Sequence, residues 1–188
     1  MAKSRRLNKQ IVVETAVLLA NSSGSWQTLT LTELATALDV RVPSLYNHVQ
    51  GQEGLRRELA LYGLKALLTA VRHAAIAKVG QEALVAIAHA YRAFAQANPG
   101  IYALTLQAPA TDDNELQQLS SELVALIALL LNSFGLAGDA ALHAFRGLRS
   151  LLHGFVSLEM GGGFGLPLDL DESFRQMVMV YLQGLAIG

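Results

Sequence analysis

Apolar side chains recur every three or four residues along most of the chain, the spacing that places them on one face of an α-helix. Alternating β-branched runs bounded by turns, the pattern of strands, do not occur. The apolar pattern predicts helices over 8–20, 31–38, 42–48, 52–77 and 84–97, one starting at 99, and helices over 114–134, 138–160 and 170–187. We therefore expect an all-α fold of about nine helices, with three short helices forming an N-terminal head and six forming a body.

Capping residues indicate where several of these helices begin. Thr30 and Glu33 have the spacing of a capping box, in which each side chain bonds the backbone N–H of the other residue. Pro43 and Pro99 fit first helical turns, where backbone N–H groups have no partner within the helix. Asn98 is the expected cap in front of Pro99.

The same period predicts which side chains of the long helices face a core. The expected stripe of the first helix is Ile11, Thr15, Leu18 and Leu19. The stripe of helix 52–77 is Leu55, Leu59, Tyr62, Ala66 and Leu67. The stripe of helix 84–97 is Leu84, Ile87, Ala88, Tyr91, Phe94 and Ala95.

Composition and charge restrict the classes of protein. The 188 residues are 52% hydrophobic, enough for a large buried core in one or two small domains, and the absence of cysteine excludes disulfides and thiolate chemistry. Residues 1–60 carry seven Lys/Arg against five Asp/Glu, whereas residues 61–188 carry seven against ten. Four of the basic residues lie in the first ten positions: Lys3, Arg5, Arg6 and Lys9. This asymmetry predicts an anionic partner at one end.

The N-terminus imitates a signal peptide, with a basic start followed by an apolar stretch. Glu14 and Thr15 interrupt that stretch, which favours a helix of the mature protein over a secretion signal. The longest apolar run, LVALIALLL at 123–131, has about half the length that a bilayer requires. We therefore expect a soluble, cytoplasmic protein without a membrane span.

The two short helices at 31–38 and 42–48, joined by a tight turn at Asp39, have the layout of a helix-turn-helix. The apolar side chains expected between the two helices are Leu34, Ala35, Leu38, Val40 and Leu45. The second helix then presents outward Ser44, Tyr46, Asn47 and His48. A major groove about 12 Å wide admits such a helix, and these side chains can bond base edges or phosphates.

The segment LTLTELATALDVRVPSLYNHVQGQEGL at 29–55 resembles the DNA-binding part of TetR-type transcriptional regulators. Its most specific part, A-x-x-L-x-V-x-x-x-x-L-Y-x-H-[FV], is matched by Ala35, Leu38, Val40, Leu45, Tyr46, His48 and Val49. The resemblance covers residues 7–62 in detail and the rest by its helical layout. NPGIYALTL and LLHGFVSLEMGG further resemble two landmarks of the WHG class of C-terminal domains, although leucine stands where that class has tryptophan.

The resemblance implies a DNA-binding domain at 1–51 and an effector-binding and dimerisation domain at 52–188. The residues expected to contact DNA are Lys3, Arg5, Arg6, Thr30, Thr32, Arg41, Pro43, Ser44, Tyr46, Asn47, His48 and Gln52. Arg41 departs from the Ser or Thr that often caps this helix in the family, at a cost of about 1 kcal/mol. Gln52 stands where a lysine commonly meets the phosphate backbone, and Arg56 and Arg57 could compensate in part.

The resemblance also implies a homodimer formed through the last two helices. The residue pattern agrees, because both helices carry apolar side chains on more than one face, as helices buried on two sides do. The residues expected in the dimer interface are Gly147, Leu151, His153, Gly154, Ser157, Leu158, Met179, Val180 and Gln183. Two heads on such a dimer would read half-sites about 34–36 Å apart in a pseudo-palindromic operator.

A small-molecule effector pocket in the body is the third implication. The candidate lining residues are Tyr91, Phe94, Tyr102, Leu106, Leu126, Leu130, Phe145 and Arg149. Aromatic and leucine stripes at helical spacing are core more often than ligand site, so each of these also has a structural interpretation. Arg149 either extends to water or meets an anionic group of the ligand.

Alternative chemistries find little support in the sequence. The run GGGFG at 161–165 lacks the preceding strand and following lysine of a phosphate loop, so we interpret it as a flexible turn. The histidines outside the head lack one-turn ligand spacing, which predicts no metal site. No hydrolase, metalloprotease or nucleotide motif occurs, and the acidic clusters at 112–115 and 169–172 suit helix starts, so we expect no enzyme and no cofactor.

The sequence as a whole therefore predicts a DNA-binding transcriptional regulator, a homodimeric repressor released from its operator by a small molecule. The alternative is a helical small-molecule-binding protein with a vestigial head.

Overall fold

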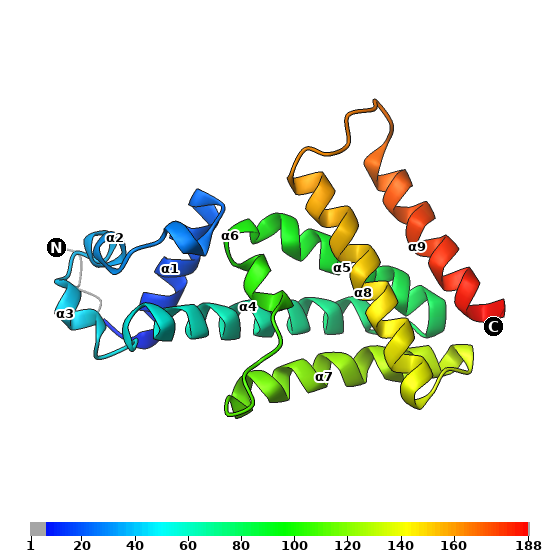
Figure 1. The fold of residues 1–188 in the computed structure, drawn as a ribbon, viewed down its shortest axis with the longest axis horizontal. Coiled ribbons are helices and arrows are strands. Elements are labelled where there is room, and N and C mark those ends of the chain that lie inside the picture. The colour runs from blue at the N-terminus through cyan, green and yellow to red at the C-terminus, as the bar shows by residue number, and fades with distance from the viewer. Residues whose placement is uncertain (1–6, 188) are drawn as a thin grey trace. The chain divides into compact units, whose positions relative to one another are not determined.

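The computed structural model describes residues 7–187, and Figure 1 shows their arrangement. The α-helices are α1 (Lys9–Ser23), α2 (Leu31–Ala37), α3 (Val42–Leu45), α4 (Gly51–Ala75), α5 (Gly80–Ala97), α6 (Pro99–Tyr102), α7 (Asn114–Leu131), α8 (Gly138–Met160) and α9 (Leu170–Ile187). Short 3-10 turns lie at Trp26–Thr28, Ala103–Leu106 and Asn132–Phe134. Within residues 7–187 there are nine α-helices and no strand, which confirms the all-α prediction.

Helix ends differ from the predicted ones by a few residues, for local reasons. The first helix continues to Ser23 and stops at Gly24, whose φ of 76° is the left-handed conformation that ends many helices. Helix α3 is shorter than predicted, because the N–H groups of both His48 and Val49 bond the Leu45 carbonyl and residues 46–48 form a turn. Asn98 holds the predicted cap position of α6, but its side chain makes no capping hydrogen bond.

The predicted core stripes hold for one helix and fail in part for two others. All six stripe residues of α5 are buried. In α4, Tyr62 is exposed although the stripe included it. In α1 the stripe was wrong: Leu18 is 68% exposed, and the buried face consists of Val12, Val13, Ala16, Val17 and Ala20. Helix α1 is apolar on two sides, so the spacing of its apolar residues does not show which side is buried. The buried side is the one whose small side chains allow close packing.

The chain forms two compact units. The first contains the chain up to Lys65 together with Ala97–Pro109, and the second contains Ala66–Gln96 and the chain from Ala110 onward. Helix α4 therefore contributes its first part to one unit and its second part to the other. The predicted domain boundary after residue 51 stays a prediction.

The first unit, the head, packs α6 directly against the end of α1. A Cβ added at Gly100 would lie 2.0 Å from the carbonyl oxygen of Ala20, so only glycine permits this approach. The Asn21 side chain completes the contact: its Oδ1 accepts from the Gly100 N–H at 3.0 Å, and its Nδ2 donates to Asn98 Oδ1 at 3.3 Å. The core of the head also includes Ile101, which is fully buried.

The second unit, the body, consists of the end of α4 with α5, α7, α8 and α9. Helix α7 packs against α8, and an ion pair of 2.6 Å between Arg72 and Glu122 joins α4 to α7. The stretch Asn114–Phe134 is long and apolar enough to cross a membrane, with a mean hydropathy of 1.2, although its longest apolar run is short. A single stretch of this kind is weak support for a span, because helices of soluble proteins pass the same test of length and composition.

We expect Gly100→Ala to lower the free energy of unfolding by at least about 2 kcal/mol, because the added methyl group overlaps the backbone of α1. Urea denaturation followed by circular dichroism measures the change. Gly165→Ala is the matched control, since a Cβ at Gly165 meets nothing within 4 Å. Equal stabilities of the two variants would contradict the close packing of α6 on α1.

Candidate functional site

The first helix of the predicted helix-turn-helix, α2, begins with the predicted capping box. Thr30 Oγ1 accepts from the Glu33 N–H at 3.1 Å, and Glu33 Oε2 accepts from the Thr30 N–H at 2.8 Å and from its hydroxyl at 2.9 Å. These hydrogen bonds to Thr30 lower the pKa of Glu33. The capping box therefore fixes the start of α2 through contacts within the chain alone.

The turn between α2 and α3 is held by backbone hydrogen bonds. The Leu38 N–H bonds Leu34 O at 3.1 Å, and the Val40 N–H bonds Ala35 O at 3.0 Å. Asp39 between them has a φ of 53°, a left-handed conformation that aspartate tolerates better than most residues. Residues 38–41 therefore connect the two helices and let α3 pack against α2.

Burial between α2 and α3 follows the prediction. Leu34 and Leu45 are fully buried, Ala35 is nearly so, and Leu38 and Val40 pack against this core from its edge. Helix α3 starts at Val42 and has Pro43 in its first turn, and the side chain of its N-cap residue Arg41 makes no capping hydrogen bond.

The side chains that this packing leaves toward solvent are Ser44, Tyr46, Asn47 and His48, which we call the reading surface. Tyr46 is 57% exposed, Asn47 is exposed, and Ser44 and His48 are half-buried. Pro43, Arg41 and Thr32 are exposed beside them. The reading surface thus combines amide, imidazole, phenol and hydroxyl groups within five positions.

Two other predicted DNA contacts already have partners within the chain. The Thr30 hydroxyl belongs to the capping box, and the Gln52 Nε2 donates to the Leu29 carbonyl at 2.7 Å. Lys3, Arg5 and Arg6 lie outside the described residues.

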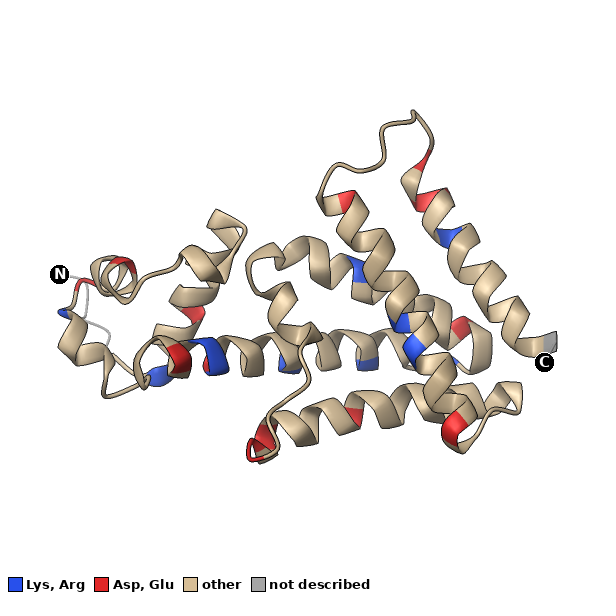
Figure 2. Cartoon of the chain, in the orientation of Figure 1, with Lys and Arg blue, Asp and Glu red and all other residues tan. Residues whose placement is uncertain are grey.

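In the described part of the head, Lys9, Arg56 and Arg57 make intramolecular contacts, and Figure 2 shows the charged residues along α4. Arg56 donates to Glu53 at 3.2 Å and to Gln107, and lies over the Trp26 ring at 5.8 Å. Lys9 forms a 2.7 Å ion pair with Glu58. The expected compensation for Gln52 by Arg56 would require these contacts to open.

The effector candidates are divided between the two units. Tyr102 and Leu106 belong to the head, and the other six belong to the body. Tyr91, Phe94 and Tyr102 are buried, and the remaining candidates, Leu106, Leu126, Leu130, Phe145 and Arg149, are half-buried. The burial of Tyr91, Phe94 and Tyr102 is expected both for core residues and for residues that line a pocket.

The residues predicted for the dimer interface mostly reach the surface of α8 and α9. Gly154, Ser157, Leu158, Val180 and Gln183 are exposed, and Leu151, His153 and Met179 are half-buried. A shallow groove of about 490 Å³ lies between the two helices, lined by Leu151, Ser173, Gln176, Met177, Val180 and Tyr181. Leu151 and Val180 therefore share one apolar depression.

Gly147, predicted to permit close approach of a second subunit, has a role inside the chain. A Cβ at Gly147 would lie 2.3 Å from the Tyr181 hydroxyl oxygen, and this hydroxyl donates to the Ala144 carbonyl at 2.7 Å. Met179 also has an intrachain contact, since its sulfur accepts from Gln81 at 3.5 Å. The small size of Gly147 thus serves the packing of α9 on α8.

A buried ion cluster in the body was missed by sequence reasoning. Arg92, on the apolar face of α5, bonds Glu159 through Nε at 2.8 Å and through Nη2 at 2.5 Å, and bonds Asp171 through Nη1 at 2.7 Å. The acidic residues at 169–172 were interpreted as helix-start residues. Asp171 and Glu172 do lie in the first turn of α9, and the Asp169 carboxylate accepts from the Asp171 N–H at 2.8 Å. In addition, the Asp171 side chain binds Arg92. An arginine within an apolar stripe was the available signal.

Among residues 7–187 no group of three or more metal-binding side chains comes together.

Glu159 makes stability depend on pH in the acid range. Hydrogen bonds from Arg92 lower the pKa of its carboxyl below 4.5, against the effect of burial. Because the folded pKa is the lower one, the ionised carboxyl contributes stability above the unfolded pKa and loses it as the pH falls through the folded value. We expect the free energy of unfolding to fall less between about pH 6 and pH 3 in Glu159→Gln than in the wild type.

Urea unfolding at several pH values measures this difference. Glu82→Gln, at an exposed position on the same helix as Arg92, is the control and should keep the wild-type slope. Identical slopes for Glu159→Gln and the wild type would show that Glu159 titrates alike in the folded and unfolded chains.

Comparisons with known proteins agree with this geometry. Residues 84–181 match the family described as Tetracyclin repressor-like, C-terminal domain. An uncharacterized HTH-type transcriptional regulator of Bacillus subtilis, YobS, is 36% identical over 97% of this chain and 94% of its own. Another uncharacterized HTH-type transcriptional regulator, from Mycobacterium tuberculosis, is 33% identical over 98% of this chain and 84% of its own.

A solved structure shows the same fold across the whole chain. The crystal structure of a TetR variant from Acinetobacter baumannii in complex with minocycline superimposes with a TM-score of 0.71, covering 95% of this chain and 96% of that one at 20% identity. That family consists of transcriptional regulators. The chain therefore belongs to the tetracycline-repressor-like family and is a DNA-binding, HTH-type transcriptional regulator.

Proposed function

We propose that the protein is a homodimeric repressor that leaves its operator when a small molecule binds in its body. The observation that supports the DNA-binding half most directly is the reading surface. Leu34 of α2 and Leu45 of α3 are both fully buried in the core cluster of the head, and Tyr46 and Asn47 after α3 are exposed.

The chemistry of the reading surface suits the major groove. Asn47 and His48 can bond base edges, Ser44 can reach a phosphate, and Tyr46 can pack on a thymine methyl. Thr32, Arg41 and Pro43 flank these side chains and would contact the backbone. The N-terminal Lys and Arg residues would add attraction that does not depend on sequence and weakens steeply with salt.

Dimerisation would place two such heads on one operator. The exposed apolar residues of α8 and α9, Leu158 and Val180 among them, and the groove between the helices support an interface there. Regulators of this family commonly act as dimers. A twofold dimer would read a pseudo-palindrome with half-sites separated by one helical turn or a multiple of it.

The effector half of the proposal rests on the body. The TetR variant with the same fold binds minocycline, and we propose that this body likewise holds a small organic molecule. Binding would shift the population toward a conformation in which α4 carries the heads out of register with successive grooves. The molecule must favour that conformation by a few kcal/mol to act as a useful switch. We propose no enzymatic activity and no cofactor.

The alternative is a small-molecule-binding protein with a vestigial head. The intact capping box of α2 and the exposed side chains of Tyr46 and Asn47 favour the regulator. A regulator of chromosomal genes would act in the cytoplasm.

Tyr46→Ala and His48→Ala test the reading surface. We expect each variant to lower affinity for a fluorescent DNA fragment from just upstream of its own coding region to the level of random DNA, while the oligomeric state stays that of the wild type. Both side chains lie in the turn directly after α3 and outside the core of the head, so the fold should persist. Fluorescence anisotropy at two salt concentrations measures binding, and sedimentation measures the oligomeric state.

The matched control is His143→Ala, which removes an exposed histidine from α8. This variant should bind like the wild type, with the same steep salt dependence. Normal binding by Tyr46→Ala and His48→Ala would show that α3 is not the reading helix. Wild-type binding no tighter than to random DNA would leave two possibilities, a distant operator or the vestigial-head alternative.

A further inference from the structure

Arg92 is the only charged residue that is buried among residues 7–187. Its side chain is 9% exposed, and its guanidinium forms a two-pronged bond with Glu159 and a third hydrogen bond with Asp171. These contacts raise the pKa of Arg92, chiefly through Glu159, so the guanidinium stays charged. None of these contacts involves the reading surface.

Aromatic rings enclose the same guanidinium. Its carbon lies 5.4 Å from the Phe155 ring centroid and 5.0 Å from that of Phe174, within the range of cation–π attraction. The two rings meet edge to face at 5.1 Å, and Phe164 of the α8–α9 loop packs on Phe155 at 4.8 Å. The Arg92 side chain is therefore fixed in position by contacts on several sides.

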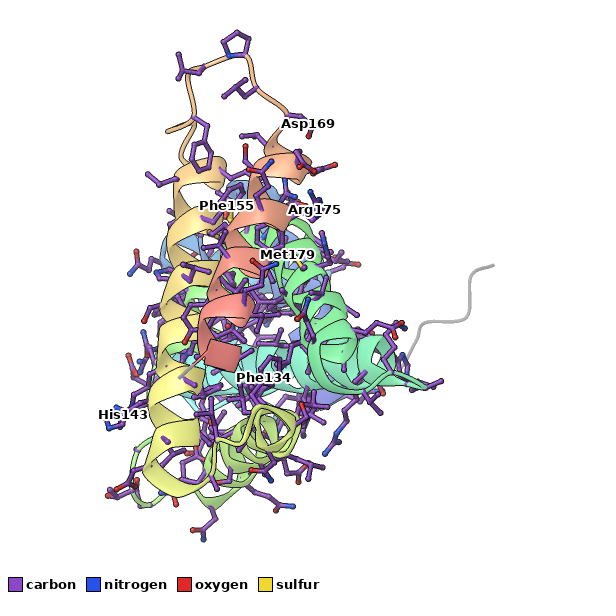
Figure 3. All side chains as sticks on the ribbon, turned by 90° about the vertical axis from the view of Figure 1, so that its right-hand side faces the viewer. Phe134, His143, Phe155, Asp169, Arg175 and Met179 are labelled. Carbon is purple, nitrogen blue, oxygen red and sulfur yellow. The ribbon has the colours of Figure 1, made fainter. Side chains whose placement is uncertain are left out.

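The partners of Arg92 come from the two ends of one connection. Glu159 lies in the last turn of α8, and Asp171 lies in the first turn of α9. Between them runs an exposed loop with four glycines, of which Gly161, Gly162 and Gly163 hydrogen-bond back to carbonyl groups of α8. Phe155 on α8 can be followed in Figure 3, together with Asp169 at the start of α9. A single side chain from α5 thus joins the facing ends of α8 and α9.

A cluster of this kind contributes geometry more than stability. Removing the guanidinium and the Glu159 carboxylate from water costs about as much as their attraction returns, whereas the flat fork of arginine donates to a carboxylate in few orientations. The relative position of α8 and α9 matters because both helices line the groove that contains Leu151 and Val180. Arg92 does not line that groove.

We infer that Arg92 is a positioning residue for dimerisation, which sets α8 against α9 so that their shared outer face fits a second copy of this chain. This inference rests on the proposed homodimer through α8 and α9. Arg92 would act on the interface through Glu159 and Asp171, without touching the partner.

Two variants separate positioning from stability. Arg92→Met leaves Glu159 buried without its partner, so it should destabilise the fold as well as the dimer. The double variant Arg92→Met with Glu159→Leu removes both charges, leaving only Asp171, which is 84% exposed and can be solvated. This double variant should unfold at a urea concentration close to that of the wild type.

Subunit exchange between unlabelled and isotope-labelled protein, followed by native mass spectrometry, measures the interface even when the dimer is too tight to dissociate on dilution. We expect the double variant to exchange subunits at least tenfold faster than the wild type at equal stability. Arg72→Met, which removes an exposed arginine–glutamate pair between α4 and α7, is the matched control and should exchange like the wild type.

The outcomes separate the inference from the proposed function. Wild-type exchange rates in a stable double variant would overturn the positioning role of Arg92 while leaving the dimer intact. A wild-type protein that is monomeric and forms no mixed dimer would overturn the proposed dimer, and the inference with it. Faster exchange in Arg72→Met as well would show that loss of any interhelical ion pair has this effect.

Discussion

The contact of Leu34 and Ala35 in α2 with Leu45 in α3 is the constraint on which the function of the head depends. A four-residue helix has too few internal hydrogen bonds to be stable alone, so α3 exists because its one fully buried side chain is held by α2. The capping box at Thr30 fixes where α2 starts, and Asp39 sets the angle at which α3 returns. This packing determines which side chains of residues 42–48 face solvent.

In the body, a few polar contacts set the positions of helices that are largely apolar. Arg92 joins α5 to the ends of α8 and α9, and the Tyr181 hydroxyl, bonded to Ala144, fits above Gly147. Apolar surfaces alone tolerate sliding, whereas such bonds allow few arrangements. The proposed dimer interface and effector site would need both properties, because an interface must be specific while a ligand site must admit its ligand.

Much of this architecture could be predicted from the sequence, because it rests on local signals. The capping box, the α5 stripe and the helix-turn-helix depend on spacing within a few residues. The buried face of α1 could not be predicted, because Leu18 and Val17 are equally apolar and only tertiary packing distinguishes them. The Arg92 cluster joins residues 67 and 79 positions apart, and the Gly100 contact joins two helices far apart in the sequence, so a local pattern cannot identify the partners of either residue.

The central claim is that a symmetric pair of α3 helices reads two half-sites. The most direct measurement is selection of bound sequences from a library of random duplexes by the wild-type protein, followed by sequencing. The account predicts enrichment of an inverted repeat whose half-sites lie about 10–10.5 base pairs apart, or a multiple of this spacing. Enrichment of a single site without a repeat would contradict the paired geometry. Absence of any enriched sequence would contradict sequence-specific reading by α3.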